Sequence, residues 1–303
     1  MIDAVITWVD GSDPVLSAKR RRYTMADELV LEDVAGATRY ADLGEIHWCV
    51  RSINKFAPWI HKIYIITDGQ DPKVESRIPV EIVDHKIVFS GYEQYLPTFN
   101  SLSIESMMWR IPGLSERFIY FNDDIFLIRP CLEEDFFIGD KPVCYGCRGP
   151  LLWFKLLVAL KKTDHGRKQV TVKSTLLRSA AVNGNIFTLL YLDHTPRSLL
   201  KSSLDRFYAT HPEALIQNIS HRFRDREQHR VDAVAYMTGG YVRRPYKKFL
   251  VYMEPKDKPD YLKKKLMLLD IPYKKFCCIN SLDKASPDDR RMVVDRIDDI
   301  LKD

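Results

Sequence analysis

The sequence lacks any apolar run long enough to cross a membrane. A transmembrane helix needs about 20 consecutive apolar residues, and the apolar runs in these 303 residues are all shorter. The amino-terminal residues, MIDAVITWVD, contain neither a basic segment nor a long apolar stretch, so they do not resemble a signal peptide. We therefore expect the protein to stay in the cytoplasm.

Sequence patterns for common cofactors are missing as well. Neither G-x-G-x-x-G nor a Walker sequence follows the first predicted strand, which argues against a dinucleotide or P-loop site. Of the six cysteines, Cys144 and Cys147 have C-x-x-C spacing and Cys277 and Cys278 are adjacent, but no second C-x-x-C and no H-x-x-x-H pair is present. We expect reduced thiols rather than a structural zinc site.

A strong excess of one charge is also absent. The 46 basic and 41 acidic residues give a net charge of +5, which suits an anionic substrate or a membrane surface. The 46% hydrophobic and 29% charged residues are ordinary for a soluble globular protein. Residues 241–275 combine 11 basic and four acidic residues with aromatic ones, but no RNA- or DNA-binding module is recognisable there. We expect no nucleic acid partner.

The first 140 residues contain an alternation of strand-like and helix-like segments. Short runs rich in β-branched or aromatic residues predict strands at 4–9, 62–67, 80–84 and 118–121. Helical patterns lie between them, and this β-α-β alternation implies a parallel sheet. We predict an α/β fold with a Rossmann-like, mostly parallel sheet over residues 1–140, flanked by helices. A helical, basic portion over residues 141–303 is expected to complete one catalytic unit.

The fourth predicted strand stops abruptly at acidic residues. The apolar run 118–121 is followed directly by Asn122, Asp123 and Asp124. Ligands of α/β proteins gather beyond the carboxyl ends of parallel strands, so these side chains are expected at a site. Adjacent carboxylates repel each other and are commonly held together by a divalent cation or by basic partners. A solvated acidic turn is the simpler alternative.

A short helix before this strand is expected to add a third carboxylate. Residues 101–110 have a helical pattern, with Asn100 or Ser101 as the cap and a Pro-Gly turn after the last residue. Three apolar residues spaced i, i+3 and i+4 would face the core. Glu105 lies off that stripe, so its carboxylate is free to face a cleft.

Two further sites near the amino terminus are candidates for substrate contact. The first predicted strand leads to Asp10 and Gly11, and small turn residues let backbone N–H groups approach a phosphate. Arg51 lies beside the apolar face of a helix predicted over residues 42–56. Pairing or capping is the simpler role for that arginine.

Residues 149–162, GPLLWFKLLVALKK, form an apolar segment of helical length. A buried helix is the simpler prediction for this segment. The alternative is an interfacial helix that rests on an anionic membrane, with Lys155, Lys161 and Lys162 beside the apolar residues.

Three long blocks resemble the Stealth family of bacterial capsular polysaccharide phosphotransferases, which is similar to the catalytic part of animal N-acetylglucosamine-1-phosphotransferase. The blocks are ITWVDGSDP at 6–14, RYADLGEIHWCVRSINKFAPWIHKIYIITDGQDP at 39–72 and LPTFNSLSIESMMWRIPGLSERFIYFNDDIFL at 96–127. Looser matches follow at 194–196, 220–225 and 276–280. After Asn280 the sequence departs from the acidic residues often seen in the family, because Ser281 follows directly.

The resemblance implies a transferase that moves sugar-1-phosphate from a nucleotide sugar, such as a UDP-N-acetylhexosamine, to a hydroxyl group of an acceptor glycan. A phosphodiester would form and a nucleoside monophosphate would leave, in the synthesis of a bacterial capsule or surface polysaccharide. The expected cofactor is Mg²⁺ or Mn²⁺. A lipid-linked acceptor would bring the enzyme into peripheral contact with the inner face of the cell membrane.

The resemblance also assigns residues, position by position. The family's essential acidic residues fall on Glu105 and Asp124, its histidine on His194 and its arginine on Arg224. The predicted metal ligands are Asp123 and Asp124. The predicted substrate-binding residues are Asp10, Gly11, Arg51, Asn100, Ser101, Asn122, His221 and Arg222.

The assigned residue types suit phosphoryl transfer, which depends on positioning and charge neutralisation. The planar guanidinium of Arg224 can hold two phosphate oxygens, and a magnesium ion at Asp124 can bridge a pyrophosphate. His194 belongs to the residue type whose ordinary pKa is near neutrality, so it can take the acceptor's proton. Glu105 could orient that histidine, bind the metal or position the acceptor.

Two other functions stay open at this point. A strand followed by Asn-Asp-Asp also resembles the acidic metal motif of nucleotide-sugar glycosyltransferases, which would release a nucleoside diphosphate. The second alternative is a non-catalytic protein that binds a glycan or nucleotide. The changed residues after Asn280 favour this second alternative, and such a protein would bind its ligand without turnover.

Overall fold

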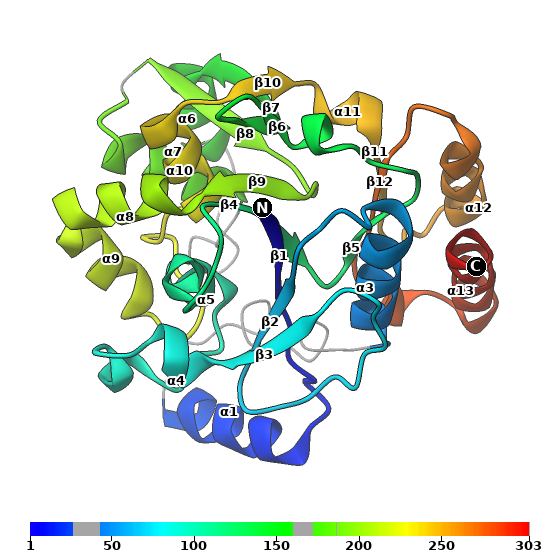
Figure 1. The fold of residues 1–303 in the computed structure, drawn as a ribbon, viewed down its shortest axis with the longest axis horizontal. Coiled ribbons are helices and arrows are strands. Elements are labelled where there is room, and N and C mark those ends of the chain that lie inside the picture. Colours follow the sequence, from blue (N-terminus) through cyan, green and yellow to red (C-terminus); the bar gives the residue numbers. More distant parts are fainter. Residues whose placement is uncertain (27–42, 160–171, 186, 303) are drawn as a thin grey trace.

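Five strands form the central sheet, in the order β3-β2-β1-β4-β9 (Figure 1). The computed structural model describes residues 1–26, 43–159, 172–185 and 187–302. The five strands are β1 (Ile2–Thr7), β2 (Ile63–Thr67), β3 (Val80–Asp84), β4 (Arg117–Asn122) and β9 (Arg197–Leu200). Strands β1 to β4 run parallel and β9 is antiparallel to β4. This confirms the predicted α/β fold with a mostly parallel sheet.

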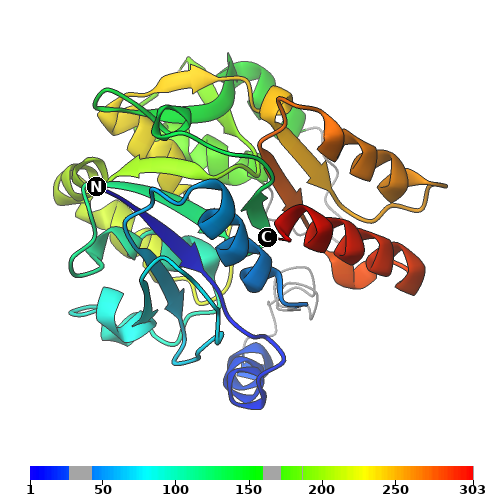
Figure 2. The ribbon, with the colours of Figure 1, turned by 45° about the vertical axis from the view of Figure 1, so that its right-hand side comes forward.

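Strand β1 is buried on both faces of the sheet. Ala4 and Ile6 belong to the core on one face, and Val5 belongs to the core on the other. Successive side chains of a strand point to opposite faces, so a strand covered on both sides needs the continuous apolar sequence seen here. The first core includes α3 (Glu45–Phe56) and α13 (Pro287–Leu301), and the second includes α5 (Ser101–Glu105), α8 (Lys201–Thr210) and α10 (Val231–Gly239) (Figure 2).

Two smaller sheets complete the β-structure of the described residues. One has the order β11-β12-β5, with β11 (Leu250–Met253), β12 (Phe276–Ile279) and β5 (Ile125–Leu127). The other contains β10 (Val242–Arg244), β7 (Lys141–Pro150) and β6 (Phe137–Ile138), with β8 (Thr188–Leu192) paired to β7. The part of the chain predicted as helical therefore also contributes strands β7 to β12. The predicted boundary at residue 140 stays a prediction, although β9 extends the sheet formed by earlier residues.

The remaining α-helices lie around these sheets. They are α1 (Pro14–Ala26), α4 (His85–Val88), α6 (Leu151–Ala159), α7 (Val172–Val182), α9 (Pro212–Ile219), α11 (Tyr246–Phe249) and α12 (Tyr261–Leu266). Within the described ranges, none of the helices combines the length and apolarity required to cross a membrane.

The predicted helix over residues 101–110 is shorter than expected. Helix α5 ends at Glu105 and a separate 3₁₀ turn follows. Ser106 Oγ donates a hydrogen bond to the carbonyl of Leu102 at 2.7 Å and accepts one from Asn218 Nδ2 at 2.7 Å. Side-chain hydrogen bonds of this kind compete with regular helix geometry, which accounts for the early end.

Segments that lie far apart in the sequence meet beyond the carboxyl end of β4. That strand ends at Asn122, and the turn into β5 carries Asp124. Because β9 is antiparallel to β4, its first residue, Arg197, pairs with Tyr120 at the same edge of the sheet. Strand β12 is antiparallel to β5 and places Cys278 at the start of β5. This edge holds most of the predicted catalytic residues.

Candidate active site

The carboxylate of Asp124 is only half satisfied by hydrogen bonds. Its Oδ2 accepts a hydrogen bond from the thiol of Cys278 at 3.4 Å, whereas its buried Oδ1 has no hydrogen-bond partner among the described residues. Burial raises the pKa of Asp124 to about 6, against the lowering effects of the Cys278 hydrogen bond and of Arg197. Buried polar atoms are rarely left unpaired, and this oxygen is free to accept a bond from a ligand.

His194 lies near Asp124, on the loop between β8 and β9. Its backbone N–H donates to Asp193 Oδ1 at 2.9 Å, and its ring centre lies 5.0 Å from that of Tyr252. One ligand atom of His194 lies within 4.8 Å of one from Asp124 and one from Cys278. Burial, followed by the charges of nearby arginines, lowers the pKa of His194 to about 4. The imidazole is therefore neutral at pH 7 and able to accept a proton.

Glu105 occupies the last residue of α5 and is 5% exposed. Burial raises the pKa of its carboxyl group, while the charges of Arg197, Arg230 and Arg224 oppose that shift. The third carboxylate predicted from the sequence is thus buried, and three arginines lie close enough to act on its charge. The expectation that this carboxylate faces a cleft stays a prediction.

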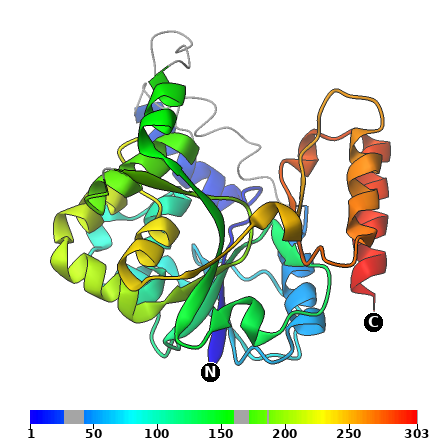
Figure 3. The same cartoon turned by 90° about the horizontal axis from the view of Figure 1, so that it is seen from above.

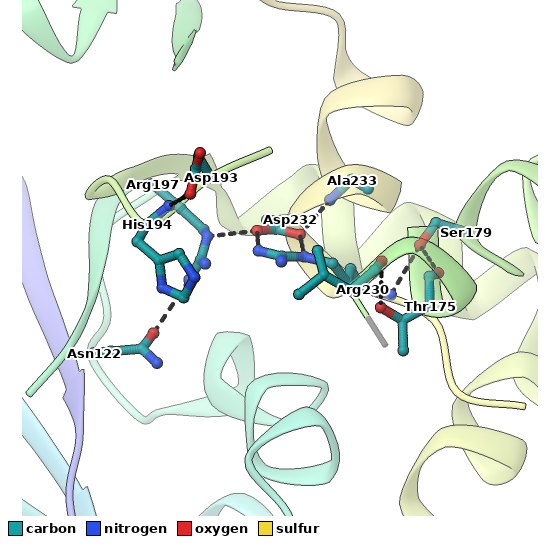
Figure 4. Close-up of polar contacts among 10 residues, drawn as sticks. Asn122, Thr175, Ser179, Asp193, His194, Arg197, Arg230, Asp232 and Ala233 are labelled. Atoms are coloured by element: carbon teal, nitrogen blue, oxygen red, sulfur yellow. Dashed lines mark hydrogen bonds and ion pairs between the residues drawn. The ribbon is translucent and has the colours of Figure 1, made fainter. Parts of the chain in front are cut away.

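Three buried charged residues, Arg197, Asp232 and Arg230, form a line that begins at Asn122 (Figure 4). Arg197 donates from Nη1 to Asn122 Oδ1 at 3.2 Å, and its Nε lies 2.5 Å from Asp232 Oδ2. Arg230 forms a bidentate contact with the same carboxylate, at 3.0 Å and 2.5 Å. Burial alone would raise the pKa of Asp232, but the two arginines outweigh it and lower the pKa to about 2.

The charges of this line act on His194 together with the opposite charge of Asp193. Two guanidinium groups share one carboxylate, and Arg197 is 6% exposed, so solvent does little to screen the charge. The line continues into α7, because the backbone N–H of Arg230 donates to Ser179 Oγ at 2.8 Å (Figure 4).

The predicted residues Asn100, Ser101 and Arg224 are brought together at the start of α5. Arg224 donates from Nη2 to Ser101 Oγ at 2.6 Å. Asn100 is fully buried, and its Nδ2 donates to the carbonyls of His221 and Phe223 at 2.9 Å and 2.8 Å. The amino terminus of α5 and the loop after α9 therefore form one unit, which places Arg224 close enough to Asp124 and His194 to affect their pKa.

The other two predicted residues of that loop have structural partners. Arg222 donates from Nη1 to the carbonyl of Pro97 at 2.6 Å, and its guanidinium carbon lies 4.5 Å from the ring centre of Tyr23. The ring Nε2 of His221 lies 3.1 Å from Gln217 Nε2. These contacts hold the loop in shape, and substrate binding by either residue stays a prediction.

Among the described residues, no contact joins Asp10, Gly11 or Arg51 to the cluster. Asp10 Oδ1 accepts from the backbone N–H and the hydroxyl of Ser12, so it stabilises its own turn. The carbonyl of Gly11 accepts a hydrogen bond from Ser17 at 3.0 Å. Arg51 pairs with Asp298 of α13 at 2.8 Å, in agreement with the simpler role considered for it.

Sequence reasoning missed four residues of the site: Arg197, Arg230, Asp232 and Cys278. Arg197 follows His194 by only three residues, so the matched block at 194–196 could have been extended to include it. Cys278 lies inside the matched block at 276–280, which was given no site residue. Arg230 and Asp232 had no usable signal, because their roles depend on contacts between distant segments.

The acidic turn at Asp123 and Asp124 fits a divalent cation. The evidence for this is one carboxylate oxygen of Asp124. Asp124 Oδ1 is a buried carboxylate oxygen without a partner in the described part of the chain, and Mg²⁺ prefers such oxygens. Cys278 and His194 offer sulfur and nitrogen, which suit softer cations better. Asp123 Oδ1 accepts from the backbone N–H of Asp124 at 3.1 Å, so this oxygen shapes the turn.

Comparison with known proteins gives two family matches and several relatives. Residues 2–27 match Stealth protein CR1, conserved region 1, and residues 39–144 match Stealth protein CR2, conserved region 2. The capsular polysaccharide phosphotransferase WcwK of Streptococcus pneumoniae is 32% identical over 252 residues, which cover 74% of each chain. LcbA of Neisseria meningitidis, also named a capsular polysaccharide phosphotransferase, is 33% identical over 239 residues, 74% of this chain and 60% of LcbA.

A third relative matches more strongly over a shorter region. The receptor polysaccharide phosphotransferase WefC of Streptococcus oralis is 42% identical over 142 residues, which are 46% of this chain and 42% of WefC. The chain thus spans less than two thirds of the length of WefC and of LcbA.

Similarity to solved structures is weaker. The galactosyltransferase LgtC in complex with donor and acceptor sugar analogs has a TM-score of 0.42 at 11% identity, covering 99% of this chain and 95% of LgtC. The apo form of mouse xyloside xylosyltransferase 1 has a TM-score of 0.42 at 9% identity, covering 92% and 98%. At these TM-scores and identities, neither structural similarity supports a conclusion about function.

Proposed function

Because the chain belongs to the Stealth family, we propose that it is a phosphotransferase that moves sugar-1-phosphate from a nucleotide sugar to a hydroxyl group of an acceptor glycan. The reaction forms a phosphodiester and releases a nucleoside monophosphate. The relatives are named capsular, receptor or exopolysaccharide phosphotransferases, which supports a role in the synthesis of a bacterial surface polysaccharide.

One observation carries the proposal: a buried carboxylate, a neutral histidine and two arginines converge beyond β4. They are Asp124, His194, Arg197 and Arg224. Phosphoryl transfer requires positive groups around the transferred phosphate and an acceptor for the proton of the attacking hydroxyl. The four side chains supply both kinds of group within one half-buried site.

The arginines are proposed to bind the phosphate attached to the sugar. Arg197 is held on one side by Asp232, and its Nη1 reaches Asn122 at the end of β4. A guanidinium fixed in this way can offer parallel N–H groups to a phosphate without losing much conformational entropy. Glu105 is proposed to keep the arginines oriented, since its carboxylate lies in their field.

His194 is proposed as the general base. The acceptor oxygen attacks the phosphorus attached to the sugar, the pyrophosphate bridge breaks, and the hydroxyl proton moves to the imidazole. In the protein alone burial, followed by the charges of the nearby arginines, lowers the pKa of His194 to about 4. A bound pyrophosphate would offset the charge of those arginines and raise the basicity of the imidazole when the substrate is present.

We propose Mg²⁺ or Mn²⁺ as the cofactor, held chiefly by the carboxylate of Asp124. Asp123 is proposed to support it, since its Oδ1 fixes the backbone of the same turn. A cation of this kind keeps several open positions for substrate oxygens and neutralises charge on the leaving phosphate.

The partners are proposed to be a UDP-N-acetylhexosamine-like donor and a glycan acceptor, the latter in lipid-linked form. We place the reaction in the cytoplasm, at the inner face of the cell membrane. The three arginines that act on His194 support an anionic donor.

The released nucleotide tests the proposal. The protein is incubated with a panel of nucleotide sugars, magnesium and candidate glycan acceptors, and the nucleotide product is identified by mass. We expect a nucleoside monophosphate, and none with Asp124→Asn. Release of a nucleoside diphosphate would make the protein a glycosyltransferase. Donor binding without any release would make it a binding protein.

A further inference from the structure

A cavity of about 440 Å³ opens beside the candidate active site. Its walls come from the end of β8 and the loop after it, from α11 and β11, and from α12 with the segment before β12. Figure 3 shows α11, in gold, between the green strand β7 and the orange helix α12. Among the described residues that line the cavity is His194, but neither Arg197 nor Arg224. The cavity thus adjoins the proposed base, whereas the proposed phosphate ligands lie outside its walls.

Three lysines line this cavity, and within the described part of the chain none of them forms an ion pair. They are Lys247, Lys265 and Lys274, and we call the space the lysine cavity. Its one acidic side chain among the described lining residues is Asp193, whose Oδ1 accepts the backbone N–H of His194 at 2.9 Å. The lysine cavity therefore has more positive than negative charge.

Lys274 is the most buried of the three lysines, with 8% of its surface exposed. Its Nζ donates to the carbonyls of Lys247 at 2.7 Å and Leu250 at 2.9 Å. An ammonium group has three N–H donors, so one remains for a ligand. Burial, followed by the charge of Lys265, lowers the pKa of Lys274. A buried ammonium group without a counter-charge is costly, and an anion in the cavity would supply that charge.

Three tyrosines line the same cavity. The ring centres of Tyr191 and Tyr246 lie 6.0 Å apart, and that of Tyr252 lies 5.0 Å from the ring centre of His194. The hydroxyl of Tyr252 accepts from Asn280 Nδ2 at 3.0 Å, which fixes this ring. A tyrosine offers an apolar ring and a polar tip. A sugar matches both, because its ring has a C–H face and a hydroxyl edge.

Helix α6 supports one of these tyrosines from outside. The ring of Phe154 stacks on Tyr191 with ring centres 6.3 Å apart. Leu152 and Trp153, by contrast, are 70% and 59% exposed. The expectation of a buried helix is therefore wrong for these two side chains. The alternative of an interfacial helix stays a prediction, since residues 160–162 lie outside the described residues.

We propose that the lysine cavity binds a negatively charged sugar unit of the acceptor glycan, next to the unit whose hydroxyl group attacks. The charge is a carboxylate of the sugar or a phosphodiester that joins two sugars. The volume of the cavity lies in the range of small-ligand sites. The identity of this glycan as the acceptor rests on the proposed function, because His194 is the proposed base. The binding of an anionic glycan does not depend on it.

Isothermal titration of the full chain with three oligosaccharides of equal length tests the proposal without donor or turnover. The first is a neutral oligomer of N-acetylglucosamine. The second alternates N-acetylglucosamine with glucuronate, and the third joins N-acetylglucosamine units through phosphodiesters. We expect one of the two anionic glycans to bind about tenfold more tightly than the neutral one, and less so as salt is added. The anionic glycan that binds more tightly identifies the source of the charge.

The double variant Lys247→Gln, Lys265→Gln should reduce this preference to about threefold or less and leave the binding of the neutral glycan unchanged. A contact with a partly exposed lysine contributes up to about fivefold in affinity. Lys247 is exposed and Lys265 half-buried, so the variant is expected to fold, which circular dichroism checks. The matched control is Lys264→Gln, which changes an exposed lysine of α12 outside the cavity and should keep the preference.

Two results would overturn the proposal. One is equal binding of the neutral and the anionic glycans, or no binding, by the folded wild-type protein. The other is a double variant that keeps the preference for the anionic glycan but loses affinity for the nucleotide sugar, because the cavity would then belong to the donor. Failure of the proposed function is distinguishable, since the released nucleotide decides that question and glycan affinity is measured here without a donor.

Discussion

At the scale of single residues, Asp232 is the side chain that holds two buried arginines in place at the site. Arg197 and Arg230 both contact its carboxylate, which is 1% exposed. Removing one member of a buried ion pair strands the remaining charges, and that costs far more than losing a pair on the surface. Asp232 is thus a positioning residue, since it acts on the proposed reaction through Arg197.

We expect Asp232→Asn to lower the free energy of unfolding by about 3 to 5 kcal/mol, because two buried guanidinium groups lose their counter-charge. Urea denaturation measures the change. The matched control is Asp298→Asn, which removes the exposed partner of Arg51 and should cost less than about 1 kcal/mol. Equal small losses in both variants would contradict the role of Asp232 in holding the arginines.

The second prediction for a single residue concerns His194, the proposed general base. His194→Ala should reduce kcat by about 10²- to 10⁴-fold, because no other described side chain is assigned to take the acceptor's proton. Unfolding by urea should be little changed, and steady-state kinetics measure the loss. The exposed His47 provides a control, since His47→Ala should retain wild-type turnover. Wild-type rates in His194→Ala would remove the histidine from the mechanism.

At the scale of elements, the site depends on the connection between α5 and the loop after α9. Asn100 caps α5 through Oδ1, which accepts from Leu102 at 3.2 Å, and its amide group holds two carbonyls of the loop. Arg224 then reaches the hydroxyl of Ser101 from that loop. A single buried side chain therefore sets the position of the predicted arginine relative to the helix that carries Glu105.

Asn100→Ala should destabilise the protein by about 3 kcal/mol, because a helix cap is lost and buried carbonyls are left without donors. It should also raise KM for the donor through displacement of Arg224. The control is Ser286→Ala, which removes the exposed cap of α13 and should cost about 1 kcal/mol. Urea denaturation and donor titration provide the two readouts, and equal costs for the two caps would contradict the account.

At the scale of the whole molecule, the sequence predicts the parallel part of the sheet well. Strands β1 to β4 were expected from local apolar runs, and they are found within two residues of the predicted limits. Helix α13 with its cap at Ser286 also has a local signature, a serine followed by proline. These elements can be predicted because their apolar runs and capping residues are local features of the sequence.

The strands that pair in antiparallel fashion, β9, β5 and β12, could not be predicted in the same way. Strand β9 has four residues, and β5 and β12 have three and four, so none has enough alternation to stand out. Their pairing nevertheless brings Arg197 and Cys278 to Asp124. The candidate site was therefore predicted where the family resemblance assigned a residue, and missed where a residue reaches the site through long-range pairing.

The most direct test of the central claim is ³¹P NMR of the purified glycan product after reaction with a nucleotide sugar. The account predicts that the wild-type protein adds a phosphodiester signal to the glycan, and that Asp124→Asn and His194→Ala do not. A glycan that gains the sugar without gaining phosphorus would contradict sugar-1-phosphate transfer. The roles proposed for His194, Arg197 and Arg224 would then have to be replaced by those of a glycosyltransferase.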